Sequence, residues 1–295
     1  MFCFSATSRR GACLPTGTSI ASFKDTMLAL DLGRHDSLYK FQRASGTNNR
    51  VAYVTLNDPD IIPEDDFKRT YGPSIVKELS KLPEWNSSFT TLVVHKNGER
   101  IWCEADTFRP HAVPKQYILD RHPAYDVFNM THLDRVRDRV SKAVLDDGRA
   151  CFLKVAHFAH ELPFLICELE AYHCLENHQS KLAPNLLGYV YEESRDRVIG
   201  FLVEPVERRV AGISDLEACS KALGELRRIL IHGDLCKYNI LITPDGPKFI
   251  AFECSTILTG TEEEEVLKSE GKQTLAAKLN DESGVGRPLS SESQL

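Results

Sequence analysis

The chain has 295 residues, and its 36 basic and 42 acidic residues give a formal net charge of −6. Hydrophobic residues make up 42% and charged residues 26%, a composition that excludes collagen, coiled coil and wholesale disorder. The negative charge argues against a nucleic-acid partner. The densest apolar run, residues 162–167, is far shorter than the roughly 20 residues that cross a bilayer, so we expect no membrane partner either.

The nine cysteines are an odd number without regular spacing. They predict reduced thiols and a cytoplasmic location, with the nucleus as an alternative. Because the sequence has no CxxC pair, a structural zinc site is not expected. The first 24 residues lack Asp and Glu, as mitochondrial transit peptides do, but a disordered terminus has the same composition and we favour it.

The first third of the chain contains no chemical motif. Residues 1–48 are polar and irregular, and we interpret them as a disordered N-terminus. Acids in a first turn favour a helix, and Asn97-Gly98 is typical of a tight hairpin turn. Residues 49–125 therefore predict an α+β extension of unknown role, with a strand over 51–56, a helix over 63–82 and a hairpin over 90–105.

From residue 130 the pattern of elements changes. The sequence predicts a helix over 162–177 and strands over 135–144, 150–156, 186–191 and 198–203. Ser214 and Glu217 match a capping box, which predicts the start of a second helix. Further elements are a hairpin over 241–252, a helix over 262–279 and a disordered tail over 281–295.

The densest chemistry lies in residues 231–242, with the sequence IHGDLCKYNILI. It places Asp234 and Asn239 five residues apart on a loop between a helix and a hairpin. An acid there can orient a hydroxyl group and accept its proton, and an amide oxygen can bind a divalent cation on nucleotide phosphates. A lone HxD is more often an ordinary turn, but this longer pattern favours phosphoryl transfer.

The run HGDLCKYNIL resembles the catalytic loop of the protein-kinase-like superfamily, in its aminoglycoside and choline phosphotransferase branch. Residues from about 130 to 260 are also similar to fungal kinase-like proteins. The resemblance implies an α+β, two-lobed fold with an N-lobe over 130–207 and a reduced C-lobe over 208–280. It also implies ATP in the cleft between the lobes, Mg²⁺ on its phosphates and a hydroxyl-bearing acceptor that the sequence does not identify.

The resemblance gives roles to further residues. Lys154, in the strand CFLKVA, would contact the α and β phosphates, held by an acid of the next helix. Glu168 and Glu170 both lie at a suitable distance in the sequence. Glu168 falls on the predicted core face, where an acid is costly unless it is paired, so we expect Glu168 to pair with Lys154. Backbone groups of Glu204 and Val206 would bind adenine.

Two features depart from the family pattern. Ala251 stands where the resemblance implies a metal-binding aspartate. Asn239 would then be the remaining metal ligand, and Glu253, two residues further on, is a possible substitute. The glycine-rich loop over the nucleotide is also missing, since Gly148 is the only glycine between residues 134 and 154.

These residues leave two functions of different classes open. One is a kinase-like phosphotransferase, impaired by Ala251, with Asp234 as the base. The other is a pseudokinase that binds a nucleotide or a protein partner without catalysis. A decayed copy of such an enzyme is a third interpretation. In the first two cases we expect Mg²⁺ to affect nucleotide binding weakly or not at all.

Overall fold

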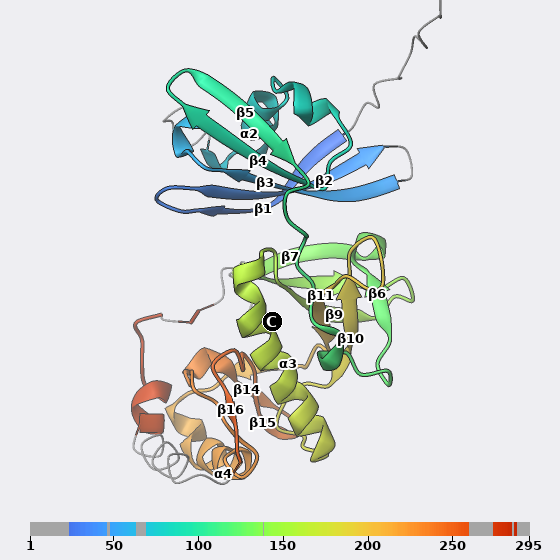
Figure 1. Cartoon of the computed structure of the whole chain (residues 1–295). Helices are drawn as coiled ribbons and strands as arrows, with labels where there is room; N and C mark the ends of the chain where they lie inside the picture. Colours follow the sequence, from blue (N-terminus) through green and yellow to red (C-terminus); the bar gives the residue numbers. More distant parts are fainter. Residues whose placement is uncertain are drawn as a thin grey trace, which may run out of the picture.

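The computed structural model describes residues 24–45, 48–62, 69–137, 139–259, 274–284 and 286–287. The protein has a mixed α+β fold with several sheets and few helices (Figure 1). A five-stranded sheet stands above a six-stranded one, and the C-terminal elements lie beyond the second sheet (Figure 1). Among the described residues, no helix is long and apolar enough to span a membrane.

The five-stranded sheet belongs to an N-terminal domain, which we define as residues 24–105. Its strands follow the order β1-β2-β3-β4-β5. They are β1 (Lys24–Leu32), β2 (Ser37–Ser45), β3 (Asn48–Leu56), β4 (Thr91–Asn97) and β5 (Arg100–Ala105). Neighbouring strands are antiparallel except β3 and β4, which are parallel. The crossover between them contains η1 (Pro59–Ile61), α2 (Gly72–Leu79) and η2 (Pro83–Asn86).

The prediction of a disordered N-terminus is wrong for residues 24–45, which form β1 and β2. Side chains alternate between the two faces of a strand. In β2, Tyr39 and Phe41 enter the core under α2, while Lys40 points to the opposite face and is buried there as well. The polar residues that suggested disorder thus belong to a strand covered on both faces. Residues 1–23 lie outside the described part of the chain.

The predicted helix over 63–82 is interrupted at Tyr71 and ends earlier than predicted. Residues 69–70 are helical, and α2 begins at Gly72, with Pro73 in its first turn, and ends at Leu79. Proline suits the first turn of a helix because its missing N–H has no helical acceptor there. Residues 63–68 lie outside the described residues. The predicted hairpin around Asn97-Gly98 is confirmed by β4 and β5.

The six-stranded sheet, called the central sheet below, has the order β6-β10-β11-β9-β8-β7. Its strands are β6 (Ala124–Asp126), β7 (Thr131–Arg137), β8 (Val140–Val144), β9 (Ala150–Val155), β10 (Leu186–Tyr191) and β11 (Val198–Val203). The single strand predicted over 135–144 is instead the hairpin of β7 and β8. Short 3-10 turns accompany the sheet at η3 (Lys115–Tyr117), η4 (Val127–Asn129) and η5 (Ala159–Glu161).

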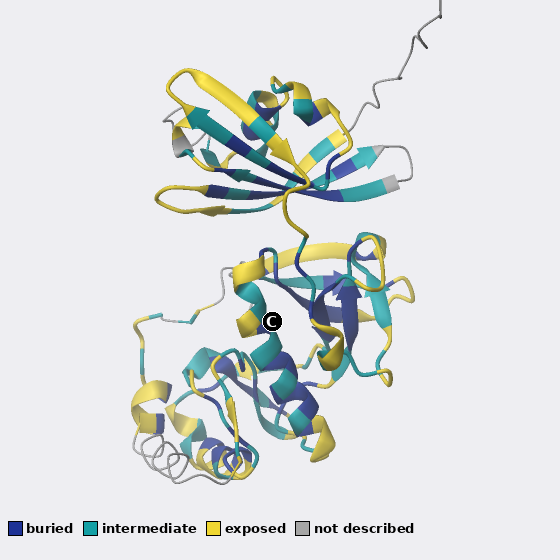
Figure 2. Ribbon diagram, viewed as in Figure 1, coloured by how far each residue is buried: buried dark blue, intermediate teal, exposed yellow. Residues whose placement is uncertain are grey.

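α3 (Leu162–Asn177) connects β9 to β10 and has the predicted bounds. Its buried side packs on the central sheet and on the C-terminal part of the chain in one continuous core, which includes Leu165, Phe201 and Leu226. Figure 2 shows the buried residues concentrated in β9 to β11 and along one side of α3. The helix therefore ties the central sheet to the elements that follow.

The described residues of the C-terminal part, within 209–287, form small sheets and one longer helix. Its elements are β12 (Arg209–Val210), η6 (Ile213–Asp215), α4 (Leu216–Leu226), β13 (Leu230–Ile231), η7 (Lys237–Asn239), β14 (Ile240–Thr243), β15 (Gly246–Phe249) and β16 (Thr256–Ile257). β12, β14 and β15 form one sheet, and β13 pairs with β16. The predicted hairpin around Asp245-Gly246 is confirmed by β14 and β15.

One prediction for this part needs correction, and another is tested only in part. The capping bond of this region belongs to the 3-10 turn η6 and not to the box of Ser214 and Glu217: Asp215 Oδ2 accepts from the Gly212 N–H at 2.9 Å. α4 begins directly after this turn, and its N-cap residue, Asp215, makes no side-chain cap bond. The helix predicted over 262–279 is helical over 274–279, and residues 260–273 lie outside the described part.

Candidate functional site

A cleft of about 340 Å³ opens between the central sheet and the C-terminal part. This volume lies within the range of small-molecule sites, about 300 to 1,000 Å³. Apolar side chains form one part of its wall: Val136, Val140, Phe152, Phe201, Val203, Leu241 and Ile250. Acidic and polar side chains form another part: Glu168, Glu204, Asp234, Asn239 and Glu253. Basic side chains complete it: Arg137, Arg139, Lys154, Arg208 and Arg209.

Lys154 on β9 and Glu168 on α3 form an ion pair in this cleft. Their side chains are 10% and 3% exposed, so water screens the pair weakly. The predicted pairing is confirmed, with Glu168 and not Glu170 as the partner. Leu165 and Glu168 are buried in this helix, whereas Phe164 in its first turn is exposed.

Lys154 has a second carboxylate partner, Glu253. The other oxygen of Glu253 accepts from Arg139 Nη2 at 2.6 Å. Burial would raise the pKa of Glu253, but the charges of Lys154 and Arg139 outweigh it and lower this pKa, so Glu253 is ionised at neutral pH. Ala251 and Glu253 lie in an irregular segment that ends in a turn, and not in a strand.

Asp234 and Asn239 line the same cleft from the loop between β13 and β14. The buried His232 ring stabilises this loop through two hydrogen bonds. Its Nε2 donates to the Ile250 carbonyl at 2.9 Å, and its Nδ1 accepts from the Asp234 N–H at 3.3 Å. Burial lowers the pKa of His232, so the ring is neutral and these two bonds fix its tautomer.

The Asn239 side chain stabilises the loop through its Nδ2, whereas its Oδ1 is left without a partner among the described residues. Its Nδ2 donates to the Asp234 carbonyl at 2.8 Å. The side chain is 1% exposed, and its Oδ1 has no hydrogen-bond partner among the described residues. Buried polar atoms in native proteins are nearly always paired, so an orphaned oxygen requires an explanation. A cation or a ligand donor would supply the missing partner.

Gly233 and Ala251 give the site its backbone shape. Gly233 has φ +77°, and a Cβ there would lie 1.9 Å from the Cys254 carbonyl oxygen, so only glycine fits. Ala251 has φ +64°, a left-handed conformation that costs most L-residues roughly 1–2 kcal/mol. Its buried neighbour Phe252 packs edge-on against Tyr172 at 5.6 Å between ring centroids, and this packing helps to fix the turn.

Of the two residues predicted to bind adenine, one lines the cleft and the other does not. Glu204 lines the cleft, but Val206 is not among its lining residues. The Glu204 carboxylate accepts from the Asn185 N–H at 3.0 Å and from Asn185 Nδ2 at 2.9 Å. These bonds anchor the segment after β11. The adenine contacts of Glu204 and Val206 stay a prediction.

The fit of the cleft to a magnesium ion is partial. In the described part of the chain, no group of three or more His, Cys, Asp or Glu side chains could hold a metal. The orphaned Asn239 Oδ1 offers one neutral oxygen, a ligand that Mg²⁺ accepts, and Asp234 lies beside it. Ala251 contributes no side-chain oxygen, and both oxygens of Glu253 bind cations of the protein. The metal role of Glu253 stays a prediction.

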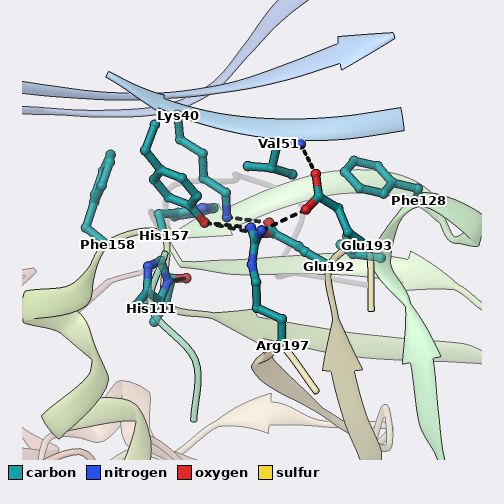
Figure 3. Close-up of polar contacts among 12 residues, drawn as sticks. Lys40, Val51, His111, Phe128, His157, Phe158, Glu192, Glu193 and Arg197 are labelled. Atoms are coloured by element: carbon teal, nitrogen blue, oxygen red, sulfur yellow. Dashed lines mark hydrogen bonds and ion pairs between the residues drawn. The ribbon is translucent and has the colours of Figure 1, made fainter. Parts of the chain in front are cut away.

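A second buried charged cluster joins the N-terminal domain to the central sheet (Figure 3). Glu192 on the turn after β10 binds Lys40 Nζ at 2.5 Å through one oxygen and Arg197 Nη2 at 2.5 Å through the other. The Tyr53 hydroxyl donates to Glu192 Oε2 at 3.1 Å. Next to it, Glu193 accepts from the Val51 N–H at 2.6 Å. We call this the interdomain cluster.

The interdomain cluster was not predicted from the sequence. Lys40 stands between Tyr39 and Phe41, and a lysine inside such an apolar run was the available signal. Burial would raise the pKa of Glu192, but Lys40 and Arg197 outweigh it and lower this pKa, so the group is ionised at neutral pH. None of these residues lines the cleft, and their arrangement indicates a structural bridge.

No family model matches the chain, and no curated protein matches it. The kinase-like resemblance therefore stays a prediction, and function has to be argued from the cleft.

Proposed function

We propose that the chain is a kinase-like phosphotransferase with impaired catalysis, which binds ATP in the cleft and moves its γ-phosphoryl group slowly to a hydroxyl-bearing acceptor. The supporting observation is convergence. The buried Lys154–Glu168 pair, Asp234 and Asn239 come from separate elements and line one cleft. In this proposal the central sheet with α3 is the N-lobe, and the C-terminal part is the reduced C-lobe.

The cleft offers a place for each part of ATP. Its apolar walls, next to Glu204 and the predicted hinge, suit a planar base. Lys154, oriented by Glu168, suits the phosphates. Asp234 would accept the proton of the acceptor hydroxyl. Mg²⁺, held through Asn239 and the phosphates, would supply charge stabilisation.

A second candidate is a pseudokinase that binds a nucleotide or a protein partner without turnover. Ala251 favours it, because no carboxylate reaches the metal from that position. The engagement of Glu253 by Lys154 and Arg139 also favours it, since Glu253 would have to leave both cations before it could bind a metal. The two candidates share a nucleotide site and differ in catalysis.

Titration with ATP, with and without Mg²⁺, followed by γ-phosphate turnover on the same sample, tests both. We expect Mg²⁺ removal to change the Kd by less than about tenfold, or 1.4 kcal/mol, and turnover to be very low. Ala251→Asp should restore clear Mg²⁺ dependence and measurable transfer. Aspartate also tolerates the left-handed backbone at this position better than alanine.

Ala251→Asn is the matched control, because asparagine tolerates the same backbone but adds no charge. It should leave turnover near the level of the unmodified chain. Brisk, strongly Mg²⁺-dependent turnover by the unmodified chain would contradict the impairment. If Ala251→Asp gains Mg²⁺ dependence without turnover, the pseudokinase is favoured. Absence of ATP binding in every variant would refute the phosphotransferase and the nucleotide-binding form of the pseudokinase.

A further inference from the structure

The arginine of the β7–β8 turn reaches the centre of the cleft. Arg139 lies two residues after the end of β7, and its guanidinium binds Glu253 at 2.6 Å. In the sequence, the same turn lacks the glycines that would bring backbone N–H groups close to phosphates. A guanidinium at this position can supply the hydrogen-bond donors that the backbone does not.

Arg139 and Lys154 hold Glu253 as they would hold a phosphate group. One carboxylate oxygen contacts Lys154 Nζ and the other contacts Arg139 Nη2. Two cations that converge on two oxygens of one anion also match two non-bridging oxygens of a phosphate, because carboxylates and phosphates accept from Lys and Arg in the same way. Glu253 thus marks the position of an anion in this cleft.

One N–H group of the Arg139 guanidinium has no hydrogen-bond partner among the described residues. Arg139 Nη1 is buried and has no hydrogen-bond partner among the described residues. A guanidinium carries five donors, and one carboxylate oxygen does not use them all. A triphosphate has more oxygens than a carboxylate, so it can satisfy Nη1 as well as Nη2. This orphaned donor is an observation independent of the Glu253 contact.

The charges of the cluster oppose a second anion. Lys154 and Arg139 face three carboxylates, Glu168, Glu253 and, at 3.8 Å from Arg139 Nε, Glu161. A polyphosphate that approaches with Glu253 in place therefore meets an excess of negative charge. If Glu253 moves away, the cluster becomes neutral, and both cations lose one partner at the point where the phosphates arrive.

We propose that Arg139 and Lys154 form a polyphosphate-binding pair, and that Glu253 occupies this pair in the unliganded protein as an internal anion which the ligand must displace. The inference rests on the proposed nucleotide site and adds Arg139 as a positioning residue. It predicts that Glu253 weakens nucleotide binding, whereas a metal-binding role for Glu253 predicts that it strengthens binding when Mg²⁺ is present.

The test is calorimetric titration of the full chain with ATP and with inorganic tripolyphosphate, each with and without Mg²⁺. Glu253→Gln keeps the shape of the side chain and removes its charge. It should tighten the Mg²⁺-free binding of both probes by roughly tenfold. Glu253→Asp keeps the charge on a shorter arm and should tighten binding less. Circular dichroism checks that Glu253→Gln is folded. If it is not, Glu253→Asp replaces it in the test.

Arg139 is tested in the Glu253→Gln background, where its contact with Glu253 no longer complicates the result. Arg139→Gln should weaken tripolyphosphate binding by roughly 10- to 100-fold, the loss typical of one charged hydrogen-bonding partner. Arg139→Lys should recover part of it. Lys115→Gln is the matched control, since Lys115 is exposed and pairs with Asp196 outside the cleft, and it should change nothing.

The outcomes separate this inference from the proposed function. If ATP binds but Glu253→Gln leaves its affinity unchanged, Glu253 is not an internal anion that the ligand displaces, and the proposed nucleotide site is retained. If Glu253→Gln weakens binding only in the presence of Mg²⁺, Glu253 is a metal ligand and the inference is overturned. If no variant binds either probe, the inference and the nucleotide site both fail.

Discussion

Lys40 and Lys154 are both buried and both bind glutamates, yet they lie in regions of different character. Lys40 pairs with Glu192 between the N-terminal domain and the central sheet, and neither residue lines the cleft. Lys154 pairs with Glu168 and Glu253 on the wall of that cleft. The Lys40–Glu192 pair is enclosed by protein, whereas the Lys154–Glu168 pair lies on the wall of a cleft that can hold a ligand.

The comparison shows that a buried Lys–Glu pair is by itself no evidence of a functional site. Desolvation makes either pair costly to break, and a buried pair often contributes little net stability compared with an apolar one. The cavity distinguishes the cleft, because Arg197 Nε in the interdomain cluster is also buried without a hydrogen-bond partner among the described residues. Asn239 and Arg139, whose Oδ1 and Nη1 lack such a partner, line the cleft, where a ligand can supply one.

The largest expected effect is on the interdomain cluster. Lys40→Met leaves Glu192 buried with Arg197 as its remaining cation, and loss of one partner of a buried pair costs about 3–5 kcal/mol. Urea unfolding followed by tryptophan fluorescence measures it. Both tryptophans of the chain, Trp85 and Trp102, lie in the N-terminal domain, so circular dichroism in parallel shows whether the two parts unfold together.

The matched variant is Lys154→Met. It leaves the buried Glu168 without its cation, so its cost should be of the same order, about 3–5 kcal/mol, while nucleotide affinity falls. Lys40→Met should leave nucleotide affinity unchanged wherever the protein is folded. If Lys40→Met abolishes nucleotide binding in the folded protein, or if Lys154→Met leaves it unchanged, the distinction between bridge and site fails.

Acid should weaken the interdomain cluster to a smaller extent. The pKa of Glu192 is lower in the folded chain than in the unfolded one, because Lys40 and Arg197 outweigh the effect of burial. Its contribution to stability is therefore complete above the unfolded pKa of about 4.3. As the pH falls below that value, the unfolded chain binds the proton first and the contribution is lost.

Urea midpoints between pH 7 and pH 3 measure this loss. Other carboxylates with lowered pKa values, Glu253 among them, add to the acid sensitivity of the unmodified chain. The difference between the unmodified chain and Glu192→Gln isolates the group of interest. This difference should be constant above about pH 5 and shrink below it, and a difference independent of pH would contradict the assignment.

Much of the local structure around the cleft was predictable. α3, β10 and β11 have the predicted bounds, because their apolar patterns are strong and polar turns delimit them. The resemblance implied that Lys154 pairs with an acid of the next helix, and helical periodicity selected Glu168 over Glu170. Such signals lie within a few residues of one another, and a sequence displays them directly.

What the sequence did not reveal were contacts between distant segments. Val51 N–H and Glu193 are 142 residues apart, and Arg139 and Glu253 are 114 apart. Each of these residues has an ordinary sequence environment, and only the packing of whole elements brings the partners together. β2 was missed for the same reason, since its polar Lys40 becomes buried through contact with the turn after β10.

The smallest expected effect comes from backbone strain, which both regions contain. Ala251 in the cleft has φ +64°, and Glu193 in the interdomain cluster has φ +60°. The left-handed conformation costs roughly 1–2 kcal/mol for an L-residue, and glycine avoids that cost but loses about 0.5–1 kcal/mol through its more flexible unfolded chain. Ala251→Gly should therefore stabilise the protein by about 0.5–1 kcal/mol.

Glu193→Gly relieves the same strain with the opposite net result. The glutamate accepts from the Val51 N–H and pairs with Arg197 Nη1 at 3.0 Å, and glycine gives up both contacts. Each is a hydrogen bond to a charged group, worth about 1.5–3 kcal/mol, so the loss exceeds the relief. Urea midpoints of the two variants should move in opposite directions. A shift in the same direction would mean that the Glu193 side chain contributes nothing to the bridge, and that the contacts of Glu192 with Lys40, Arg197 and Tyr53 hold the turn after β10.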